Sequence, residues 1–216
     1  MNTPEIRTFA TPPLLAESLA TEVAGLLRAS ARPSLVVPGG STPKPFFERF
    51  SKQNLPWETI HLTLTDERWV EATSEASNQK LLADTLLPTG IRFIPLKNDA
   101  PTPEEGLPEI THRLLHIPRP FDVVILGMGE DGHTASLFPG NAGAALDLDN
   151  DALCVAVTPE GKEPRLSLTA SCLLNSKQII VYITGHKKRA LLEQDGLPIH
   201  VFLRQDFVPV TVYWTE

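Results

Sequence analysis

His133 is the residue of this chain whose type and position point most directly to chemistry. It ends the segment Asp131-Gly132-His133, which closely follows the apolar run at 121–126. An imidazole is the best side-chain base near neutral pH, and the end of a buried strand is a position from which it can reach a bound ligand. We therefore expect this segment to be a catalytic turn.

The same turn has two other interpretations. Its glycines form a G-x-G-x-x-G pattern at 127–132, which is the dinucleotide-binding fingerprint. Glu130 and Asp131 would, however, place carboxylates where a pyrophosphate should lie, and Pro139 limits the following helix to about two turns. The glycines could also serve only to reverse the chain. We favour the catalytic turn over both alternatives.

A second candidate is the segment Gly39-Gly40-Ser41-Thr42, which joins a predicted strand to a predicted helix. Glycines allow backbone N–H groups to approach an anion, and the hydroxyls of Ser41 and Thr42 add donors. The helix N-terminus adds partial positive charge, which suits a phosphate. An ordinary turn that binds nothing is the alternative. The segment lacks the spacing of a Walker loop.

Other charged residues are ambiguous when each is considered alone. Asp66-Glu67-Arg68 follows an apolar run and could be a solvated loop with an ion pair. Arg165 and Lys188, taken singly, are more typical of surface charges. His112 and His116 have a helical spacing that can hold a metal, but two surface histidines are the better interpretation.

The elements that must position these residues alternate between apolar runs and amphipathic segments. This alternation predicts an α/β fold, with one domain over 1–216 and a central, mostly parallel sheet that helices cover on both faces, in the Rossmann-like manner. We expect strands at 34–37, 60–65, 91–96, 121–126, 153–157, 177–184 and 208–214. We expect helices at 13–31, 43–50, 77–87, 169–175 and 186–194, and one of about ten residues that leads to 117.

Ligands of such sheets bind beyond the carboxyl ends of the strands. The segments 39–42, 66–68 and 127–133 each follow the end of a predicted strand. We therefore expect them to converge on one site.

Composition excludes several classes of protein. The 216 residues carry 19 Lys and Arg against 26 Asp and Glu, a net charge of −7, which argues against a nucleic-acid partner. The longest apolar run, Ile179–Ile183, is far shorter than the roughly 18 residues of a membrane span. The N-terminus shows no export signal, and Cys154 and Cys172 form neither a disulfide framework nor a metal motif. We expect a soluble, cytoplasmic protein.

Six segments occur in the order that one known family shows them: Gly39-Gly-Ser-Thr-Pro43, Thr65-Asp-Glu-Arg68, Ser77-Asn78, Gly127-x-Gly-x-Asp-Gly-His-Thr-Ala-Ser-Leu-Phe-Pro139, Pro164-Arg-Leu-Ser-Leu-Thr169 and Gly185-x-x-Lys188. Together they resemble the 6-phosphogluconolactonases, and the similarity extends from about residue 10 to the end of the chain. That family belongs to a superfamily that includes glucosamine-6-phosphate deaminase, whose members share a single α/β domain with a parallel sheet.

The resemblance implies hydrolysis of 6-phospho-D-glucono-1,5-lactone, a step of the oxidative pentose phosphate pathway, without a metal or other cofactor. His133 matches the general base of the family. Asp66 and Arg68 match its active-site acid and arginine, and Arg165 and Lys188 match its phosphate ligands.

Three finer assignments accompany this resemblance. Asp131 is expected to orient the imidazole, and the loop at 39–42 to hold the phosphate. Lys187 or Arg189 could replace Lys188, because the match depends on one glycine-to-lysine spacing. For the assembly, we expect a monomer or a weak homodimer.

Two alternative functions remain open. An amino-sugar-phosphate deaminase would carry a glutamate a few residues after the histidine, but 135–140 contains no carboxylate. A non-catalytic sugar-phosphate-binding module of a transcription regulator would need a DNA-binding segment, for which we find no signal.

Overall fold

The computed structural model describes residues 4–140, 143–149 and 151–216. The main sheet contains β1 (Glu5–Phe9), β2 (Ser34–Val37), β3 (His61–Leu64), β5 (Arg92–Phe93), β6 (Val123–Leu126), β9 (Ile179–Thr184) and β10 (Val210–Thr215), and its central strands are rich in branched apolar residues. Their spatial order is β1-β10-β9-β6-β2-β3-β5, and every neighbouring pair is parallel. The predicted parallel α/β architecture is confirmed.

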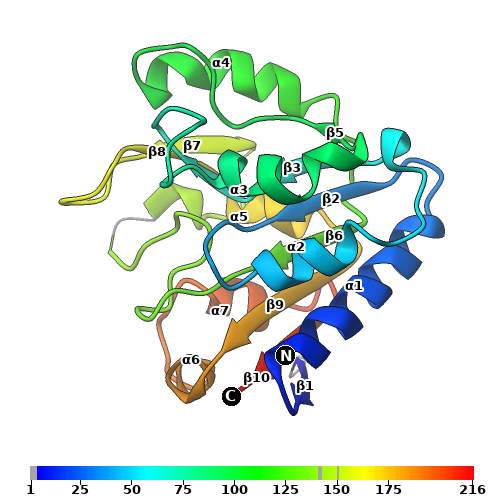
Figure 1. Ribbon diagram of the computed structural model, residues 1–216. Coiled ribbons are helices and arrows are strands. Elements are labelled where there is room, and N and C mark those ends of the chain that lie inside the picture. The colour runs from blue at the N-terminus through cyan, green and yellow to red at the C-terminus, as the bar shows by residue number, and fades with distance from the viewer. Residues whose placement is uncertain (1–3, 141–142, 150) are drawn as a thin grey trace.

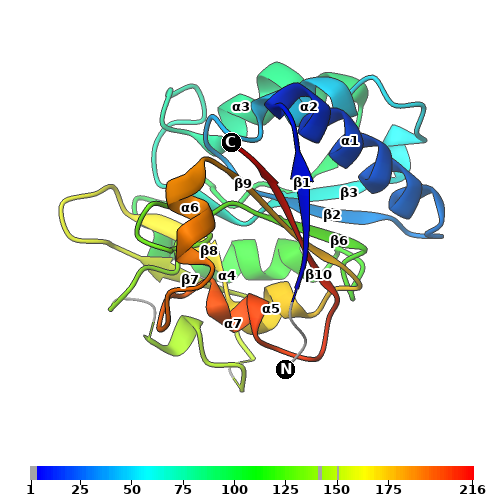
Figure 2. The same ribbon diagram turned by 90° about the horizontal axis from the view of Figure 1, so that it is seen from below.

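Helices cover both faces of this sheet (Figures 1 and 2). One face carries α1 (Pro12–Arg28), α2 (Lys44–Phe50) and α3 (Asn78–Thr85), and the other carries α5 (Ala170–Leu174) and α7 (His200–Leu203). The remaining helices are α4 (Pro103–Leu114) and α6 (His186–Leu191), together with short 3₁₀ turns at Trp57–Thr59, Leu87–Thr89 and Gly143–Ala145.

Helix α1 shows how the sequence specifies an element and where the pattern misleads. The Thr11 side chain caps the helix by accepting a hydrogen bond from the Leu14 backbone N–H, and prolines occupy the first two helical positions. The helix ends at Arg28, three residues before the predicted end. Leu14 and Leu26 are 56% and 37% exposed, because the buried stripe of the helix is narrower than its run of leucines.

A second, antiparallel sheet corrects the sequence-based prediction. It contains β4 (Asp66–Arg68), β8 (Arg165–Leu168) and β7 (Cys154–Val157), in the order β4-β8-β7. The strand predicted at 153–157 exists, but it does not belong to the parallel sheet. The strands β4 and β8 were not predicted, since three or four residues that begin with a charge give no apolar run, and only their pairing makes them strands.

The segment after the histidine turn reverses the chain without a helix. Residues 134–140 form no helix; Thr134 and Leu137 instead make an isolated β-bridge. The Thr134 hydroxyl donates to the carbonyl of Gly127, which folds the chain back on itself before Pro139. Strand β1 and the four-residue helix α7 were missed as well, because neither has a distinctive periodicity.

Residues of both sheets belong to one continuous hydrophobic core. Cys154 and Cys172 are buried free thiols, and burial raises the pKa of Cys172 to about 12. None of the helices in the described ranges has the length and apolarity that crossing a bilayer requires.

Candidate active site

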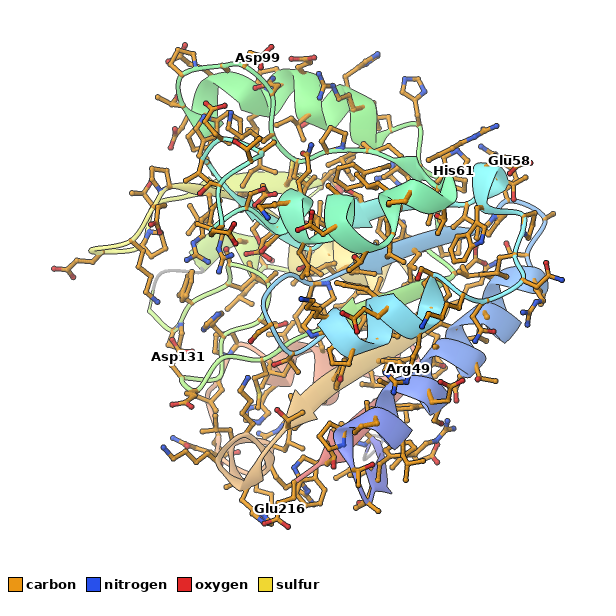
Figure 3. The ribbon with its side chains drawn as sticks, viewed as in Figure 1. Arg49, Glu58, His61, Asp99, Asp131 and Glu216 are labelled. Carbon is orange, nitrogen blue, oxygen red and sulfur yellow. The ribbon has the colours of Figure 1, made fainter. Side chains whose placement is uncertain are left out.

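A pocket of about 260 Å³ lies at the carboxyl ends of β2, β3, β6 and β9. The convergence that we expected from the strand ends is therefore found. Figure 3 shows Asp131 at this end of the sheet, whereas His61, which begins β3, lies at the opposite end. The site residues proposed from sequence that line the pocket are Gly39, Gly40, Ser41, Thr42, Asp66, Arg68, His133, Arg165 and Lys188.

His133 and Asp131 form a hydrogen-bonded pair at the rim of the pocket. Asp131 Oδ1 lies 2.5 Å from His133 Nδ1 and accepts the His133 backbone N–H at 3.1 Å. A carboxylate can only accept, so Nδ1 carries the proton and Nε2 is left as the basic atom. Partial burial works to raise the pKa of Asp131, but the hydrogen bonds from His133 outweigh it and lower that pKa. Asp131 thus stays ionised as the partner of the imidazole.

Two glycines, Gly129 and Gly132, allow the imidazole to take up its position. A Cβ atom on Gly129 would lie 2.2 Å from the His133 ring, so no other residue fits beneath it. Gly132 has a φ of +78°, and its carbonyl accepts a hydrogen bond from the Ile199 backbone N–H. The Phe138 ring packs against the imidazole at a centroid distance of 4.4 Å.

This arrangement contradicts the dinucleotide interpretation of the glycines. The imidazole occupies the space over Gly129 into which a pyrophosphate would have to move. The helix that such a site requires is absent from 134–140, all of which the structure describes.

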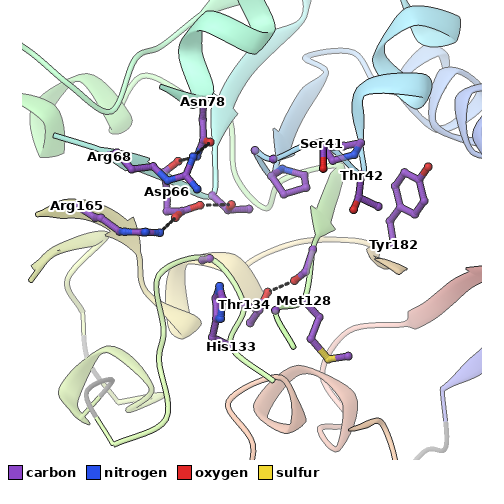
Figure 4. Close-up of a pocket in the computed structure, with 18 of the residues that line it drawn as sticks. Ser41, Thr42, Asp66, Arg68, Asn78, Met128, His133, Thr134, Arg165 and Tyr182 are labelled. Atoms are coloured by element: carbon purple, nitrogen blue, oxygen red, sulfur yellow. Dashed lines mark hydrogen bonds and ion pairs between the residues drawn. The ribbon is translucent and has the colours of Figure 1, made fainter. Parts of the chain in front are cut away.

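Arg68 and Arg165 bring two positive charges together. They are register partners on the antiparallel strands β4 and β8, so their side chains project from the same face. Arg165 Nη1 lies 3.8 Å from Asp66 Oδ2, and Arg68 Nη1 donates to the carbonyl of Ala76 and to Asn78 Oδ1, each at 2.9 Å. Figure 4 shows both arginines across the pocket from Ser41 and Thr42.

Asp66, which we expected as an active-site acid, is almost fully enclosed. Its carboxylate is buried and accepts hydrogen bonds from the hydroxyls of Thr65 at 3.0 Å and Ser136 at 2.5 Å. Together with the Arg165 contact, these bonds occupy both carboxylate oxygens. The geometry therefore fits a residue that orients Arg165 at least as well as one that contacts the sugar.

Glu67 was not recognised from the sequence, where it was one charge of a possible solvated loop. It is only 1% exposed and accepts hydrogen bonds from the backbone N–H groups of Arg68, Asn78 and Gln79 and from the Ser77 hydroxyl. Burial raises the pKa of Glu67, although the backbone hydrogen bonds act in the opposite direction. Glu67 thus joins β4 to the start of α3, where the Ser77 side chain caps the helix.

Of the three neighbouring cations at the start of α6, Lys188 is the one that lines the pocket. Lys187 is exposed, and Arg189 forms a salt bridge of 3.1 Å with Glu193 on the same helix. Burial lowers the pKa of Lys188, and the nearby Glu130 carboxylate partly opposes this effect. A lysine that is partly desolvated and faces a pocket is well placed for an anionic ligand.

The loop at 39–42 reaches the pocket from the end of β2. Gly40 has a φ of +88°, which favours glycine, and a Cβ atom on Gly39 would lie 1.8 Å from Asn78 Oδ1. The glycines are therefore required for steric reasons as well as for the approach of a ligand. Other pocket-lining residues that sequence reasoning did not assign to a role include Thr65, Asn78, Met128 and Tyr182.

The candidate metal pair is not supported by its surroundings. His112 and His116 are exposed, and their rings lie 5.3 Å apart. Within the described ranges, no group of three or more His, Cys, Asp or Glu residues could hold a metal ion.

Parallel α/β proteins bind their ligands beyond the strand ends, and the cations at this edge select an anion. The chain is thus an α/β protein with a pocket at its strand ends that Arg68, Arg165 and Lys188 line. A family model described as glucosamine-6-phosphate isomerases/6-phosphogluconolactonase matches residues 11–197, and the chain belongs to this family.

Individual relatives agree with this membership. The chain is 39% identical to a 6-phosphogluconolactonase of Rhizobium meliloti, over 95% of this chain and 96% of the relative. It is 35% identical to a 6-phosphogluconolactonase of Caulobacter vibrioides, over 98% and 97% of the two chains. A crystal structure of a 6-phosphogluconolactonase from Shewanella baltica superimposes with a TM-score of 0.94 at 39% identity, and covers 99% of this chain and 98% of its own.

Proposed function

We propose that this protein hydrolyses 6-phospho-D-glucono-1,5-lactone to 6-phospho-D-gluconate in the oxidative pentose phosphate pathway. The observation that carries this proposal is one pocket that combines the His133–Asp131 pair with the cations Arg68, Arg165 and Lys188. The base is what lactone hydrolysis needs, and the cations are what a phosphorylated substrate needs. The shared name of the Rhizobium, Caulobacter and Shewanella relatives supports the same substrate.

His133 begins the reaction as a general base. Its Nε2 takes a proton from water while the water oxygen attacks the lactone carbonyl, an effect worth about 10²- to 10⁴-fold in rate. Asp131 holds the proton on Nδ1 and stabilises the imidazolium that forms. When the carbon–oxygen bond of the ring breaks, the imidazolium returns its proton to the departing ring oxygen. The products are a carboxylic acid, which ionises, and a free hydroxyl group.

Charge on the carbonyl oxygen must be stabilised as the tetrahedral intermediate forms. The groups available are Arg68 and the backbone N–H groups of the glycine turns, and one such donor contributes on the order of 3 kcal/mol. We assign the phosphate to the loop at 39–42, Arg165 and Lys188. Binding energy at this remote group fixes the lactone in register with His133.

Neither alternative function gains support from the site. A deaminase would need a glutamate shortly after the histidine. The described segment 134–140 contains no carboxylate, and its Phe138 ring packs on the imidazole. For a non-catalytic binding module, the paired base and its carboxylate have no evident use.

We place the reaction in the cytoplasm, because two buried free thiols fit a reducing compartment. For the assembly we propose a monomer or a weak homodimer. Two of the large apolar side chains exposed on the described surface, Leu14 and Leu26, lie on α1, and the other three come from different segments of the chain: Leu115, Leu148 and Phe207.

The test is to generate the 6-phospho-lactone in situ by enzymatic oxidation of glucose 6-phosphate and to follow acid release. We expect the protein to accelerate hydrolysis far above the spontaneous rate, and to do so much less for the unphosphorylated lactone. A rate equal to the uncatalysed background with the phosphorylated lactone would show that the proposed function is wrong.

A further inference from the structure

Asn78 is the residue in the pocket wall with the most unexplained contacts. It is 3% exposed and lines the pocket. Its side-chain Oδ1 accepts a hydrogen bond from Arg68 Nη1 at 2.9 Å, and its Nδ2 donates to the backbone carbonyl of Asp66 at 2.8 Å. Figure 4 shows the amide directly above Arg68 and Asp66. One side chain thus holds both the strand and the guanidinium that projects from it.

The backbone of Asn78 is fixed independently of this amide. Its N–H donates to Glu67 Oε1 at 2.8 Å, and the N–H of the next residue, Gln79, donates to Glu67 Oε2 at 2.7 Å. Glu67 also accepts the backbone N–H of Arg68. The start of α3 and the end of β4 are therefore locked together, so that the direction of the Asn78 side chain is set before any ligand arrives.

Arg68 needs a hydrogen-bond partner such as Asn78 because another arginine faces it. Its register partner is Arg165, and like charges at directly opposite positions of a sheet repel. Both side-chain hydrogen bonds recorded for Arg68 leave from Nη1, to Ala76 and to Asn78. Within the described ranges, Nε and Nη2 make no hydrogen bond and remain available to a ligand. Without the Asn78 amide, the guanidinium would lose one of its two fixed contacts.

The same amide also sets the position of the glycine loop. A Cβ atom on Gly39 would lie 1.8 Å from Asn78 Oδ1, 2.0 Å from its Cγ and 2.5 Å from its Nδ2. The loop backbone therefore rests directly on the Asn78 side chain. Gly39 and Arg68 line the same pocket, so Asn78 fixes the distance between the loop and the cation.

We propose that Asn78 is a positioning residue for lactone hydrolysis, which acts through Arg68 by holding its guanidinium in the pocket against Arg165. This inference rests on the proposed function, in which Arg68 takes part in lactone hydrolysis. A direct contact between Asn78 and the substrate is the competing role, since one N–H of its amide has no partner in the described part of the chain.

A double-mutant cycle separates these two roles. The proteins are wild type, Asn78→Ala, Arg68→Met and the double variant, and kcat/KM is measured with the lactone generated in situ. We expect Asn78→Ala to lower kcat/KM about tenfold, the effect of a lost hydrogen bond to a charged group. In the Arg68→Met background the same substitution should change kcat/KM by less than about twofold. A tenfold loss in both backgrounds would overturn the inference.

Ser77→Ala is the matched control. It removes a neighbouring buried side chain that caps α3 and binds Glu67, but that has no recorded contact with Arg68. We expect it to lower Tm while kcat/KM stays within about twofold of wild type, as for a residue that serves stability alone. A tenfold loss of kcat/KM in Ser77→Ala would mean that any damage to this helix start impairs the site, and the specific role of Asn78 would fail.

Binding of 6-phosphogluconate by calorimetry to the same four proteins keeps this inference separate from the proposed function. If wild type does not hydrolyse the lactone, the proposed function fails, and the coupling between Asn78 and Arg68 is judged from product affinity alone. Weaker binding by Asn78→Ala only when Arg68 is present supports the inference; equal weakening in both backgrounds overturns it. If Asn78→Ala does not fold, Asn78→Ser replaces it in the cycle.

Discussion

Arg68 and Arg165 occupy facing positions on two antiparallel strands, where like charges ordinarily destabilise a sheet. Asp66 offsets part of this repulsion from the Arg165 side, and the Asn78 amide holds Arg68 on the other. Arg165 is almost fully buried, and its Nε has no hydrogen-bond partner among the described residues. An anion bound between the two guanidinium groups would offset the cost of keeping them so close together.

Replacing Arg165 by alanine should therefore weaken substrate binding more than it slows the chemical step. We expect KM to rise about 10- to 100-fold, as for the loss of a charge-assisted hydrogen bond, with a smaller change in kcat. The measurement is steady-state kinetics together with calorimetric binding of 6-phosphogluconate. If Arg165→Ala binds this product as tightly as wild type does, the assignment of Arg165 to the phosphate fails.

Lys188 and its neighbour Lys187 allow a direct comparison. Because only Lys188 lines the pocket, Lys188→Met should raise KM about tenfold, whereas Lys187→Met, with an exposed side chain, should have no effect. Equal effects of the two substitutions would show that Lys188 acts only through its long-range electrostatic field and does not contact the ligand.

The pH dependence of product binding provides a second test of Lys188. Burial lowers the pKa of its ammonium group, so the positive charge is lost as pH rises through a value below the ordinary one for lysine. Wild type should bind 6-phosphogluconate more weakly on the alkaline side, and Lys188→Arg, which stays charged, should show a smaller decline. Parallel declines in both proteins would exclude Lys188 as the titrating group.

Asp131→Asn tests the partner of the imidazole. An amide can still accept from Nδ1, but it carries no charge to stabilise the imidazolium, so kcat should fall on the order of tenfold, less than for loss of the base itself. The side chain of Asp131 is 48% exposed, and solvent screening keeps the effect modest. A kcat equal to that of wild type would remove Asp131 from the mechanism.

Gly39→Ala probes the close contact between the glycine loop and the Asn78 amide. The new Cβ would overlap three atoms of that amide, so we expect a lower Tm and a large loss of activity. Gly39 is not in the left-handed region, so the overlap is the main obstacle. The double variant Gly39→Ala/Asn78→Ala removes the overlapping atoms and should have a higher Tm than Gly39→Ala. No such recovery would mean that the loop is constrained by something else.

The sequence predicted the parallel sheet well, because most of its strands are apolar runs that end at turn-forming residues such as proline and glycine. The run at 34–37 is the strand β2 as observed, and Ser77 and Thr169 cap the helices that follow them. The segments that carry the candidate site residues follow strand ends, so the topology of a parallel sheet alone predicted that they share one pocket.

The second sheet could not be found in the same way. Glu67 and Arg165 are charged residues whose burial depends on partners distant in the sequence, and no local pattern distinguishes them from surface charges. Among Lys187, Lys188 and Arg189, only the start of α6 after Gly185 decides which side chain faces the pocket. The link between Asn78 and Arg68 likewise exists only once β4 and α3 are packed together.

His133 is the residue on which the proposed lactone hydrolysis depends most directly. The decisive measurement is acid release from the 6-phospho-lactone formed in situ, compared between wild type and His133→Ala at equal concentration, with Tm as a check that both are folded. We predict that wild type accelerates hydrolysis and that His133→Ala loses about 10²- to 10⁴-fold of the rate with its fold intact. A folded His133→Ala protein that turns over the lactone as fast as wild type would contradict the account.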